Sequence, residues 1–212
     1  MARVVIAFDV NETLLDLSVL DELLGGAEAR ARWFSLMLQV AFVGAITDRY
    51  VDFTTAQRAA LTMLGHDDNA DAVIHRMTQL PPHPDAAPAL ERLRDSGHQL
   101  AALTNSTLGV AQSQLQNAGL AGRFDAILSA DQVQALKPRP EPYHLVARHF
   151  GVEPSEMRLV AAHAWDISGA LAAGCKAAFV RRPGKALSPV GDQPDIAGDD
   201  LLEVAGRIID AA

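Results

Sequence analysis

The sequence contains a single cysteine, Cys175, which excludes an internal disulfide and indicates a reducing compartment. It also has no run of basic residues: Lys and Arg together number 18 against 26 Asp and Glu, and the formal net charge is -8. A surface that follows a phosphate backbone needs clustered positive charge, so we expect no nucleic-acid partner. The segment before Asp9 is too short for a secretory signal, and we therefore expect a cytoplasmic protein.

Long hydrophobic runs are absent as well. The longest apolar stretch, 34–46, contains Gln39 and Gly44 and falls short of the roughly 20 residues needed to cross a bilayer, so it predicts a buried helix and no membrane partner. A second apolar face on this helix makes a homodimer possible. With 49% hydrophobic and 21% charged residues, the 212-residue chain can bury a core large enough for one domain and a sizeable insertion.

Short apolar runs alternate with helical segments over much of the chain. The run 4–8 is almost unbroken and rich in β-branched residues, which is typical of a central parallel strand buried on both faces. Similar runs lie at 100–103, 126–128, 159–162 and 177–180. Between the later strands, helical segments at 108–118, 142–150 and 167–173 each end at a glycine, a helix stop signal. The pattern predicts an α/β fold with a doubly wound, Rossmann-like parallel sheet, whose ligand crevice lies at the carboxyl ends of the strands.

Residues 15–84 interrupt this alternation and contain no convincing strand. Helical stretches are predicted at 19–24, 28–46, 54–64 and 70–79. Thr54 and Gln57 form a capping-box pattern at the start of the third stretch, and a proline cluster at 81–84 ends the insertion. We therefore predict a helical cap domain over 15–84, inserted into a core domain made of 1–14 and 85–212.

Polar side chains follow several of the predicted strands at the point where each strand ends. They are Asp9, Asn11, Glu12 and Thr13, then Thr104 and Asn105, then Lys137, and then His163 and Asp166. Because parallel strands end at one edge of the sheet, these side chains can converge in the shared crevice. A carboxylate there can act as a base or a nucleophile, and a nearby lysine would keep Asp9 ionised and stabilise charge that develops on its oxygens. Lys137 is the candidate for that lysine.

Four motifs along the chain resemble those of the haloacid dehalogenase superfamily. They are FDVNETL, LTNS, LKP and AAHAWD, which occur in the family's order with a helical insertion after the first. The resemblance covers nearly the whole chain. It implies that Asp9 is a nucleophile that forms a covalent ester, that Thr104 and Asn105 position it, and that Lys137 stabilises it.

The residue two positions after the nucleophile separates branches of this superfamily. The phosphatases have an acid there, whereas this chain has Asn11, which cannot protonate a leaving alcohol, and Asp166 lacks the neighbouring acid that usually completes a magnesium site. The segments TDRYVDF and LKPRPEPY, with Trp165 beside Asp166, instead resemble the type II (S)-2-haloacid dehalogenases. That resemblance implies a hydrolase that converts short 2-haloalkanoic acids to 2-hydroxy acids without a metal or other cofactor.

The chain departs from the common dehalogenase pattern at several positions. Phe34 stands after Trp33 where an arginine is usual, so an expected anion clamp is missing. Glu12 and His163 stand where the pattern has Gly and Asn. A carboxylate that orients an imidazole is a physical arrangement for general-base catalysis, and this pair resembles a dehalogenase subgroup with such a water-activating dyad.

The pocket for the carbon and halogen skeleton is predicted from aromatic residues that could equally belong to the core. They are Trp33, Phe34, Phe53, Tyr143 and Trp165. Asp166 either takes part in the site or caps the helix that follows it. Either Arg181 or Arg182, near another strand end, could supply the missing anion contact.

Two other functions stay open on the sequence alone. One is a superfamily phosphatase acting on a small phosphorylated metabolite, which the shared motifs allow and Asn11 opposes. The other is a binding module without turnover, suggested by the missing cap arginine. Dependence on magnesium discriminates the first from a dehalogenase, and halide release from 2-haloacids would exclude the second.

Overall fold

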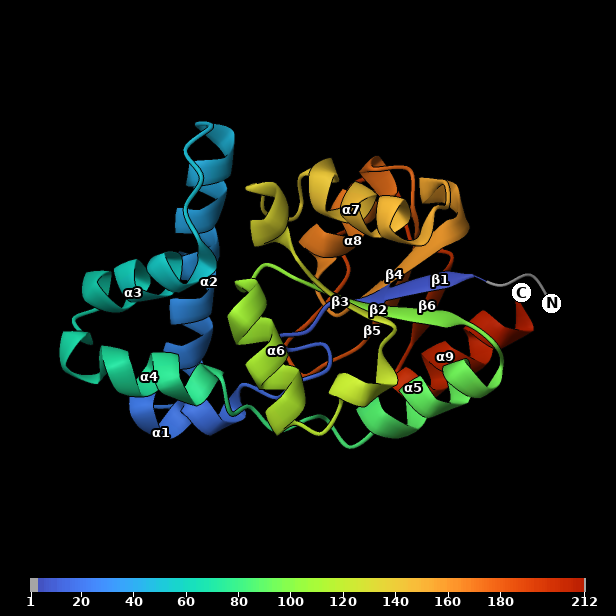
Figure 1. Ribbon diagram of the computed structural model, residues 1–212. Coiled ribbons are helices and arrows are strands. Elements are labelled where there is room, and N and C mark those ends of the chain that lie inside the picture. Colours follow the sequence, from blue (N-terminus) through green and yellow to red (C-terminus); the bar gives the residue numbers. More distant parts are fainter. Residues whose placement is uncertain (1–3, 212) are drawn as a thin grey trace.

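Six parallel strands form the centre of the computed structural model, which describes residues 4–211 (Figure 1). In chain order they are β1 Val5–Phe8, β2 Gln99–Thr104, β3 Ala126–Ser129, β4 Met157–Ala161, β5 Lys176–Val180 and β6 Ile196–Gly198. Their order in the sheet is β3-β2-β1-β4-β5-β6. The direction of winding reverses between β1 and β4, and the crevice of a doubly wound sheet opens at this reversal. The predicted α/β fold is confirmed, and Asp9 lies at the end of β1, beside the reversal.

Helices cover both faces of the sheet. Figure 1 shows α7 (Pro140–Phe150) and α8 (Ala164–Ala172) on one face, and α5 (Ala86–Asp95), α6 (Leu108–Asn117) and α9 (Leu201–Asp210) on the other. Alternate residues of β1 belong to separate hydrophobic clusters on the two faces: Ile6 and Phe8 to one, Val5 and Ala7 to the other. All four are almost completely buried, as an apolar run without polar alternation predicts. Single-turn 3-10 helices lie at Ala121–Arg123, Ala130–Val133 and Pro154–Glu156.

The segment between β1 and α5, which we call the cap, contains helices and connecting turns and no strand of the sheet. It consists of a 3-10 turn at Ser18–Leu20, α1 Asp21–Leu24, α2 Ala27–Ile46, α3 Phe53–Met63, a 3-10 turn at Asp67–Asn69 and α4 Ala70–Met77. The two connections to the core run side by side, since Leu15 forms an antiparallel bridge with Pro82 and the amide of His83 donates to the carbonyl of Leu14 at 2.8 Å. The cap is therefore joined to the core through one narrow, paired neck.

The predicted elements agree with the observed ones to within three residues at each end, with one local correction. The capping box at Thr54 is wrong, because α3 begins one residue earlier and is capped by Asp52, whose carboxylate accepts from the amide of Thr55 at 3.0 Å. An aspartate is as good a helix cap as threonine, and here it precedes the first helical residue. Within residues 4–211, no helix is long and apolar enough to span a membrane.

Close packing of α8 on the loop before α7 allows only glycine at position 169. A Cβ atom there would lie 2.6 Å from Cβ of Pro138 and 2.5 Å from the hydroxyl of Tyr143. We predict that Gly169→Ala lowers the free energy of unfolding by about 1–3 kcal/mol through overpacking, measured by denaturant titration. Gly109→Ala is the matched control, because nothing lies within 4 Å of its Cβ and alanine favours the helix. Equal stability of the two variants would contradict the packing argument.

Candidate active site

Asp9 and Lys137 form a buried ion pair at the end of β1. Nζ of Lys137 lies 2.9 Å from Oδ1 of Asp9 and 2.6 Å from Oδ2 of Asp166, and it donates to the carbonyl of Leu103 at 3.0 Å. These three contacts use all the donors of the ammonium, which is completely buried. Burial alone would raise the pKa of Asp9, but Lys137 and His163 outweigh it and hold that pKa far below its usual value. Asp9 is therefore ionised, which is the state in which a carboxylate can act as a nucleophile.

Asp166 is the second carboxylate that contacts the ammonium of Lys137. Its Oδ1 accepts from the hydroxyl of Tyr143 at 2.6 Å, and the side chain has no exposed surface. Burial raises the pKa of Asp166 and the charge of Asp9 adds to that rise, while Lys137 counteracts it. The alternative reading of Asp166 as a helix cap is wrong, because α8 begins at Ala164, before Asp166.

Polar side chains of two motifs, FDVNETL and LTNS, fix the structure around this pair. The side chain of Asn105 makes two hydrogen bonds with the backbone of Lys137, accepting from its amide at 2.8 Å and donating to its carbonyl at 3.1 Å. Thr13 donates its hydroxyl to Oδ2 of Asp9 at 2.6 Å and accepts from the amide of Ala162 at 3.0 Å. Thr104 accepts from the amide of Ser106 at 3.1 Å, which turns the chain back at the end of β2.

His163 lies between two carboxylates. Its Nδ1 is 3.2 Å from Oδ2 of Asp9, and its Nε2 is 2.9 Å from Oε2 of Glu12. Burial would lower the pKa of His163, but hydrogen bonds and charge from Asp9 and Glu12 raise it to about 8. Burial would raise the pKa of Glu12, but His163 and Lys185 hold it below its usual value. The resting site thus contains a protonated imidazole held by two ionised acids.

The imidazole also stacks on two aromatic rings. The ring of Phe34, from α2 of the cap, lies 5.6 Å from it at an interplanar angle of 10°, and the ring of Trp165, from α8, lies 5.2 Å away at 27°. The face of an aromatic ring attracts positive charge, so both contacts favour the protonated form. The residue that replaces the usual cap arginine therefore packs directly on the candidate base.

A small cavity lies beside Asp9, between the cap and the core, and we call it the closed cavity because seven of its eight lining residues are buried. Its lining consists of Asp9, Asn11, Phe34, Phe53, Thr104, Asn105, His163 and Trp165. Its free volume of about 10 Å³ holds a single water molecule. Eight of the twelve residues predicted as catalytic or substrate-binding therefore meet around one space, and Glu12 and Lys137 contact members of this lining.

The other two predicted pocket residues, Trp33 and Tyr143, lie outside that lining. Trp33 is fully buried within the cap, where its indole donates to the carbonyl of Gln57 at 3.2 Å. Tyr143 is buried in the core beneath Asp166. Both indole and phenol need a polar partner when buried, and each finds that partner away from the cavity.

Asn11 is held by one hydroxyl, from Ser106 of the LTNS motif, and by one amide, from Gln114, which lies outside all four motifs. Its Nδ2 donates to the hydroxyl of Ser106 at 3.2 Å, and its Oδ1 accepts from Gln114 at 3.0 Å. Gln114 is a buried polar residue on α6 that also donates to the carbonyl of Met77 at 2.7 Å. A glutamine on an otherwise ordinary helix gives no sequence signal of this contact.

The two arginines predicted as anion contacts are engaged elsewhere. Arg182 pairs with Asp85 at 2.8 Å and donates to the carbonyl of Thr13, and Arg181 pairs with Asp199. Neither lines the closed cavity, so the suggestion that one of them replaces the cap arginine is wrong. The cations missed by the sequence analysis are Lys185, 2.6 Å from Oε2 of Glu12, and Arg30, 3.7 Å from Oε1.

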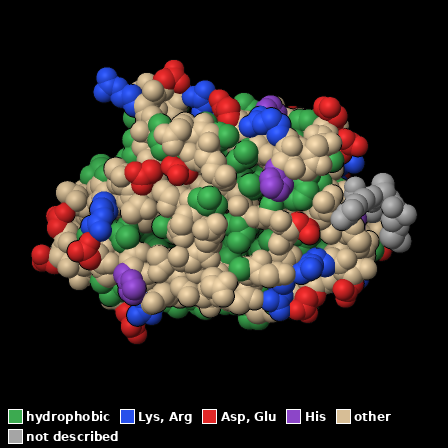
Figure 2. Space-filling view, viewed as in Figure 1, with side chains coloured by type: hydrophobic (Ala, Val, Ile, Leu, Met, Phe, Trp, Pro, Cys, Tyr) green, Lys and Arg blue, Asp and Glu red, His purple; other side chains and the backbone are tan. Residues whose placement is uncertain are grey.

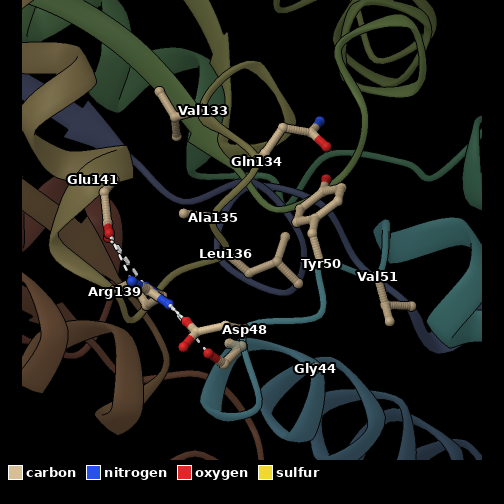
Figure 3. A pocket seen from close by; sticks show the side chains of 11 residues that line it. Gly44, Asp48, Tyr50, Val51, Val133, Gln134, Ala135, Leu136, Arg139 and Glu141 are labelled. Atoms are coloured by element: carbon tan, nitrogen blue, oxygen red, sulfur yellow. Dashed lines mark hydrogen bonds and ion pairs between the residues drawn. The ribbon is translucent and has the colours of Figure 1, made fainter.

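A second cavity of about 230 Å³ lies where the end of α2 meets the loop before α7 (Figure 3). Arg139 reaches across it, donating to the carbonyl of Ala45 at 3.2 Å and pairing with Asp48 at 2.9 Å. Tyr50 makes a parallel tie by donating to Asp131 at 2.7 Å. These contacts fasten the cap to the core near Lys137, and none involves the groups around Asp9.

The outer surface and the acidic side chains set limits on other kinds of site. On the face in Figure 2, Lys and Arg side chains lie among Asp and Glu and form no continuous basic stripe. Across residues 4–211, no three His, Cys, Asp or Glu side chains are grouped so as to hold a metal ion.

A family model and several named proteins match this chain in sequence. The family model described as haloacid dehalogenase-like hydrolase matches residues 4–174. Haloacetate dehalogenase H-2 of Moraxella sp. (strain B) is 32% identical over 203 residues, covering 90% of this chain and 91% of that protein. (S)-2-haloacid dehalogenase 2 of Pseudomonas sp. (strain CBS-3) is 30% identical over 212 residues, covering 93% of each.

Solved structures agree with these relatives. The L-2-haloacid dehalogenase of Xanthobacter autotrophicus superposes with a TM-score of 0.89 at 25% identity, covering 100% of both chains. The same enzyme with chloropropionic acid covalently bound gives a TM-score of 0.87 at 25% identity, again over 100% of both chains. Since the match extends through the sheet, the cap and all four motifs, the chain belongs to the haloacid dehalogenase-like hydrolases.

Proposed function

We propose that this protein is a 2-haloacid dehalogenase, which converts short 2-haloalkanoic acids to 2-hydroxy acids through an ester on Asp9. The observation that carries the proposal is the ionised Asp9, 2.9 Å from the buried Lys137 ammonium, with the His163 imidazole 3.2 Å away on its other oxygen. The names of the relatives and the covalent complex of a structural neighbour support the same chemistry. No metal or organic cofactor takes part.

In the first step, an oxygen of Asp9 attacks the carbon that bears the halogen. The new carbon–oxygen bond forms as the carbon–halogen bond breaks, and the halide leaves with the bonding electrons, which inverts the configuration at carbon. Lys137 keeps the attacking oxygen ionised, so no base is needed for this step. The positive charge of the protonated His163 beside the cavity offsets the repulsion between Asp9 and an anionic substrate, in a chain that lacks the usual cap arginine.

Ester formation changes the state of His163. Asp9 loses its negative charge, so one of the two carboxylates that raise the pKa of His163 is removed. The pKa of the imidazole must then fall, and the ring loses a proton at the stage when a base is required. In the tautomer with its proton on Nε2, the ring donates to Glu12 and presents a free Nδ1 toward Asp9.

In the second step, Nδ1 of His163 removes a proton from water, and the water oxygen attacks the ester carbon of Asp9. Lys137 stabilises the negative oxygen of the tetrahedral intermediate. The bond between that carbon and the alkyl oxygen breaks, the 2-hydroxy acid leaves with the proton from His163, and the new carboxyl of Asp9 returns a proton to the ring. Each turnover therefore consumes one water and releases one halide and one proton.

The closed cavity must open for substrate to enter. Its free volume of about 10 Å³ is too small for a three-carbon acid. We propose that residues 15–84 move as a unit about the paired neck at Leu15 and Pro82, which would break the contacts of Arg139 with Asp48 and of Tyr50 with Asp131. The motion would carry Phe34 and Phe53 away from the site. The contact of Phe34 with His163 would then form only when the cap closes.

We further propose a cytoplasmic enzyme that can pair with a second copy of itself. Burial raises the pKa of the lone thiol, Cys175, to about 11, so it is an inert core residue suited to a reducing compartment. Val43 on α2 and Met63 on α3 line an apolar groove and are 54% and 63% exposed, and Ile46 on α2 is 82% exposed. Covering that face is the physical reason for a homodimer.

We predict halide release from short 2-chloro and 2-bromo acids at the same rate with and without chelator, because Lys137 holds Asp9. Lys137→Met should lower the rate by about 10²–10³. Hydrolysis of a phosphate ester that requires magnesium would instead support a phosphatase. The Asn11 carboxamide, whose atoms are occupied by Ser106 and Gln114, argues against that outcome. Failure to release halide from any such acid would support a binding module.

We predict that His163→Ala still forms the Asp9 ester, slowed by less than about tenfold because the imidazolium charge is lost, and hydrolyses it about 10²–10⁴ times more slowly, since the base is lost and the nucleophile is kept. Intact mass spectrometry after mixing with a 2-haloacid would show a lasting adduct. His149→Ala, which removes an exposed histidine from the end of α7, is the matched control and should leave no adduct. An ester that turns over at the wild-type rate in His163→Ala would remove the Glu12 and His163 dyad from the mechanism.

A further inference from the structure

A second pocket lies on the other side of Glu12 from the closed cavity. This outer pocket has a free volume of about 370 Å³, and its lining includes Glu12, Arg30, His83, Arg182, Lys185 and Asp199. It shares no lining residue with the closed cavity. Since Glu12 lines the outer pocket and bonds His163, the two side chains together form the wall between the spaces.

The backbone of Glu12 is held in place by two hydrogen-bonding partners, Leu15 and His83. Its backbone has a φ of 62°, which is rare for a residue with a side chain, and its amide donates to the carbonyl of Leu15 at 2.9 Å. A ring nitrogen of His83 lies 3.3 Å from its carbonyl oxygen. A strained backbone that is fixed by several contacts marks a side chain whose direction matters.

One oxygen of that carboxylate faces both neighbours. Oε2 of Glu12 is 2.9 Å from Nε2 of His163 and 2.6 Å from Nζ of Lys185, while Oε1 is 3.7 Å from Arg30. Lys185 also lies 5.2 Å over the ring of Phe34, the ring that stacks on His163. Lys185 therefore contacts the candidate base's partner and the aromatic ring above it.

Among the described residues, Lys185 is the cation lining the outer pocket whose carboxylate partner is Glu12 and no other acid. Arg30 bonds Asp21 at 2.6 Å, Arg182 bonds Asp85 at 2.8 Å, and Arg181 bonds Asp199. Among residues 4–211, Lys185 makes its one carboxylate contact with Glu12. The other titratable groups of this pocket are Asp16 and His83, and His83 contacts the backbone of Glu12 and not its carboxylate.

The proton balance of the proposed reaction makes this arrangement consequential. The resting His163 is protonated, and it must lose that proton after the ester forms and before it can activate water. Nδ1 must lose this proton, because it faces Asp9 and acts as the base, whereas Nε2 keeps its proton in the bond to Glu12. The charge on Glu12 and its neighbours therefore sets how readily the ring loses its Nδ1 proton between the two chemical steps.

We propose that Lys185 is a positioning residue for the proposed dehalogenation: it holds the Glu12 carboxylate between His163 and the outer pocket and opposes the positive charge of His163, so that the ring gives up its proton once the ester has formed. This inference rests on the proposed function, because it concerns the state of the base in the second step. Lys185 does not contact Asp9 and is not a lining residue of the closed cavity, so the first step should depend on it only weakly.

The test is the pH dependence of each step, measured on the full chain by rapid mixing with 2-bromopropionic acid. The halide burst reports ester formation, and the decay of the adduct mass reports ester hydrolysis. In Lys185→Met, a positive charge that opposes the imidazolium is lost, the pKa of His163 rises, and the rising limb of ester hydrolysis should move up by about one pH unit. At pH values below the wild-type midpoint that shift slows hydrolysis about tenfold, while the burst rate changes less than about twofold.

Three further variants separate charge from structure. Lys185→Arg keeps the charge and should restore the wild-type midpoint. Glu12→Gln removes the charge that holds the proton on His163, so its midpoint should move in the opposite direction, to lower pH. Arg181→Met removes an exposed cation of the same pocket that does not touch Glu12, and should change neither step.

A Lys185→Met variant with an unmoved midpoint, or with equal losses in burst and hydrolysis, would overturn the role of Lys185. The role of Lys185 would also be overturned if Lys185→Arg slowed ester hydrolysis as much as Lys185→Met does, because keeping the charge would then restore nothing. Failure of the proposed function is a different result, because the wild-type protein would then give no halide burst.

Discussion

The fold of the site depends on a fully buried ammonium. Moving the charge of Lys137 out of water is costly, and the interior accepts it because Asp9, Asp166 and the carbonyl of Leu103 occupy all three of its donors. The same arrangement holds the attacking carboxylate ionised and directed at the closed cavity. The loop that carries Lys137 is held by Asn105 and packed against Gly169, so the geometry of the nucleophile is set by core packing.

From the Lys137 and Asp9 pair outward, the charged side chains of the site alternate in sign. Lys137 is followed by Asp9, then by the protonated His163, then by Glu12 and finally by Lys185 at the outer pocket. Each charge has a neighbour of opposite sign, and so each is stabilised in a poorly hydrated interior. Esterification of Asp9 removes one member of this row and shifts the proton affinity of the next. In the proposed mechanism, this one covalent change therefore turns a site arranged for attack by Asp9 into one in which His163 can act as a base.

Much of the fold and the centre of the site could be predicted because both follow from local pattern. Unbroken apolar runs identified β1 to β5, and polar residues at strand ends identified Asp9 and Thr104. The expected strand-end position of Lys137 is wrong, because Lys137 lies in the loop between β3 and α7; the LKP motif is what identified it. Burial direction could not be read in the same way: an aromatic residue at helical spacing gives no sign of whether it faces a cavity, as Phe34 does, or the core, as Trp33 and Tyr143 do. Lys185 lies in a loop, and only the fold brings it to Glu12, 173 residues away.

The central claim is that the carboxylate of Asp9 becomes covalently attached to the substrate and is then hydrolysed at its own carbonyl carbon. A single turnover in oxygen-18 water, with protein in excess over a 2-haloacid, tests this directly by mass spectrometry of the peptide that contains Asp9 and of the product. The account predicts that the label enters the Asp9 carboxylate and is absent from the first 2-hydroxy acid released. Label in that product with an unlabelled Asp9 would mean that water attacks the substrate directly, and would contradict the account.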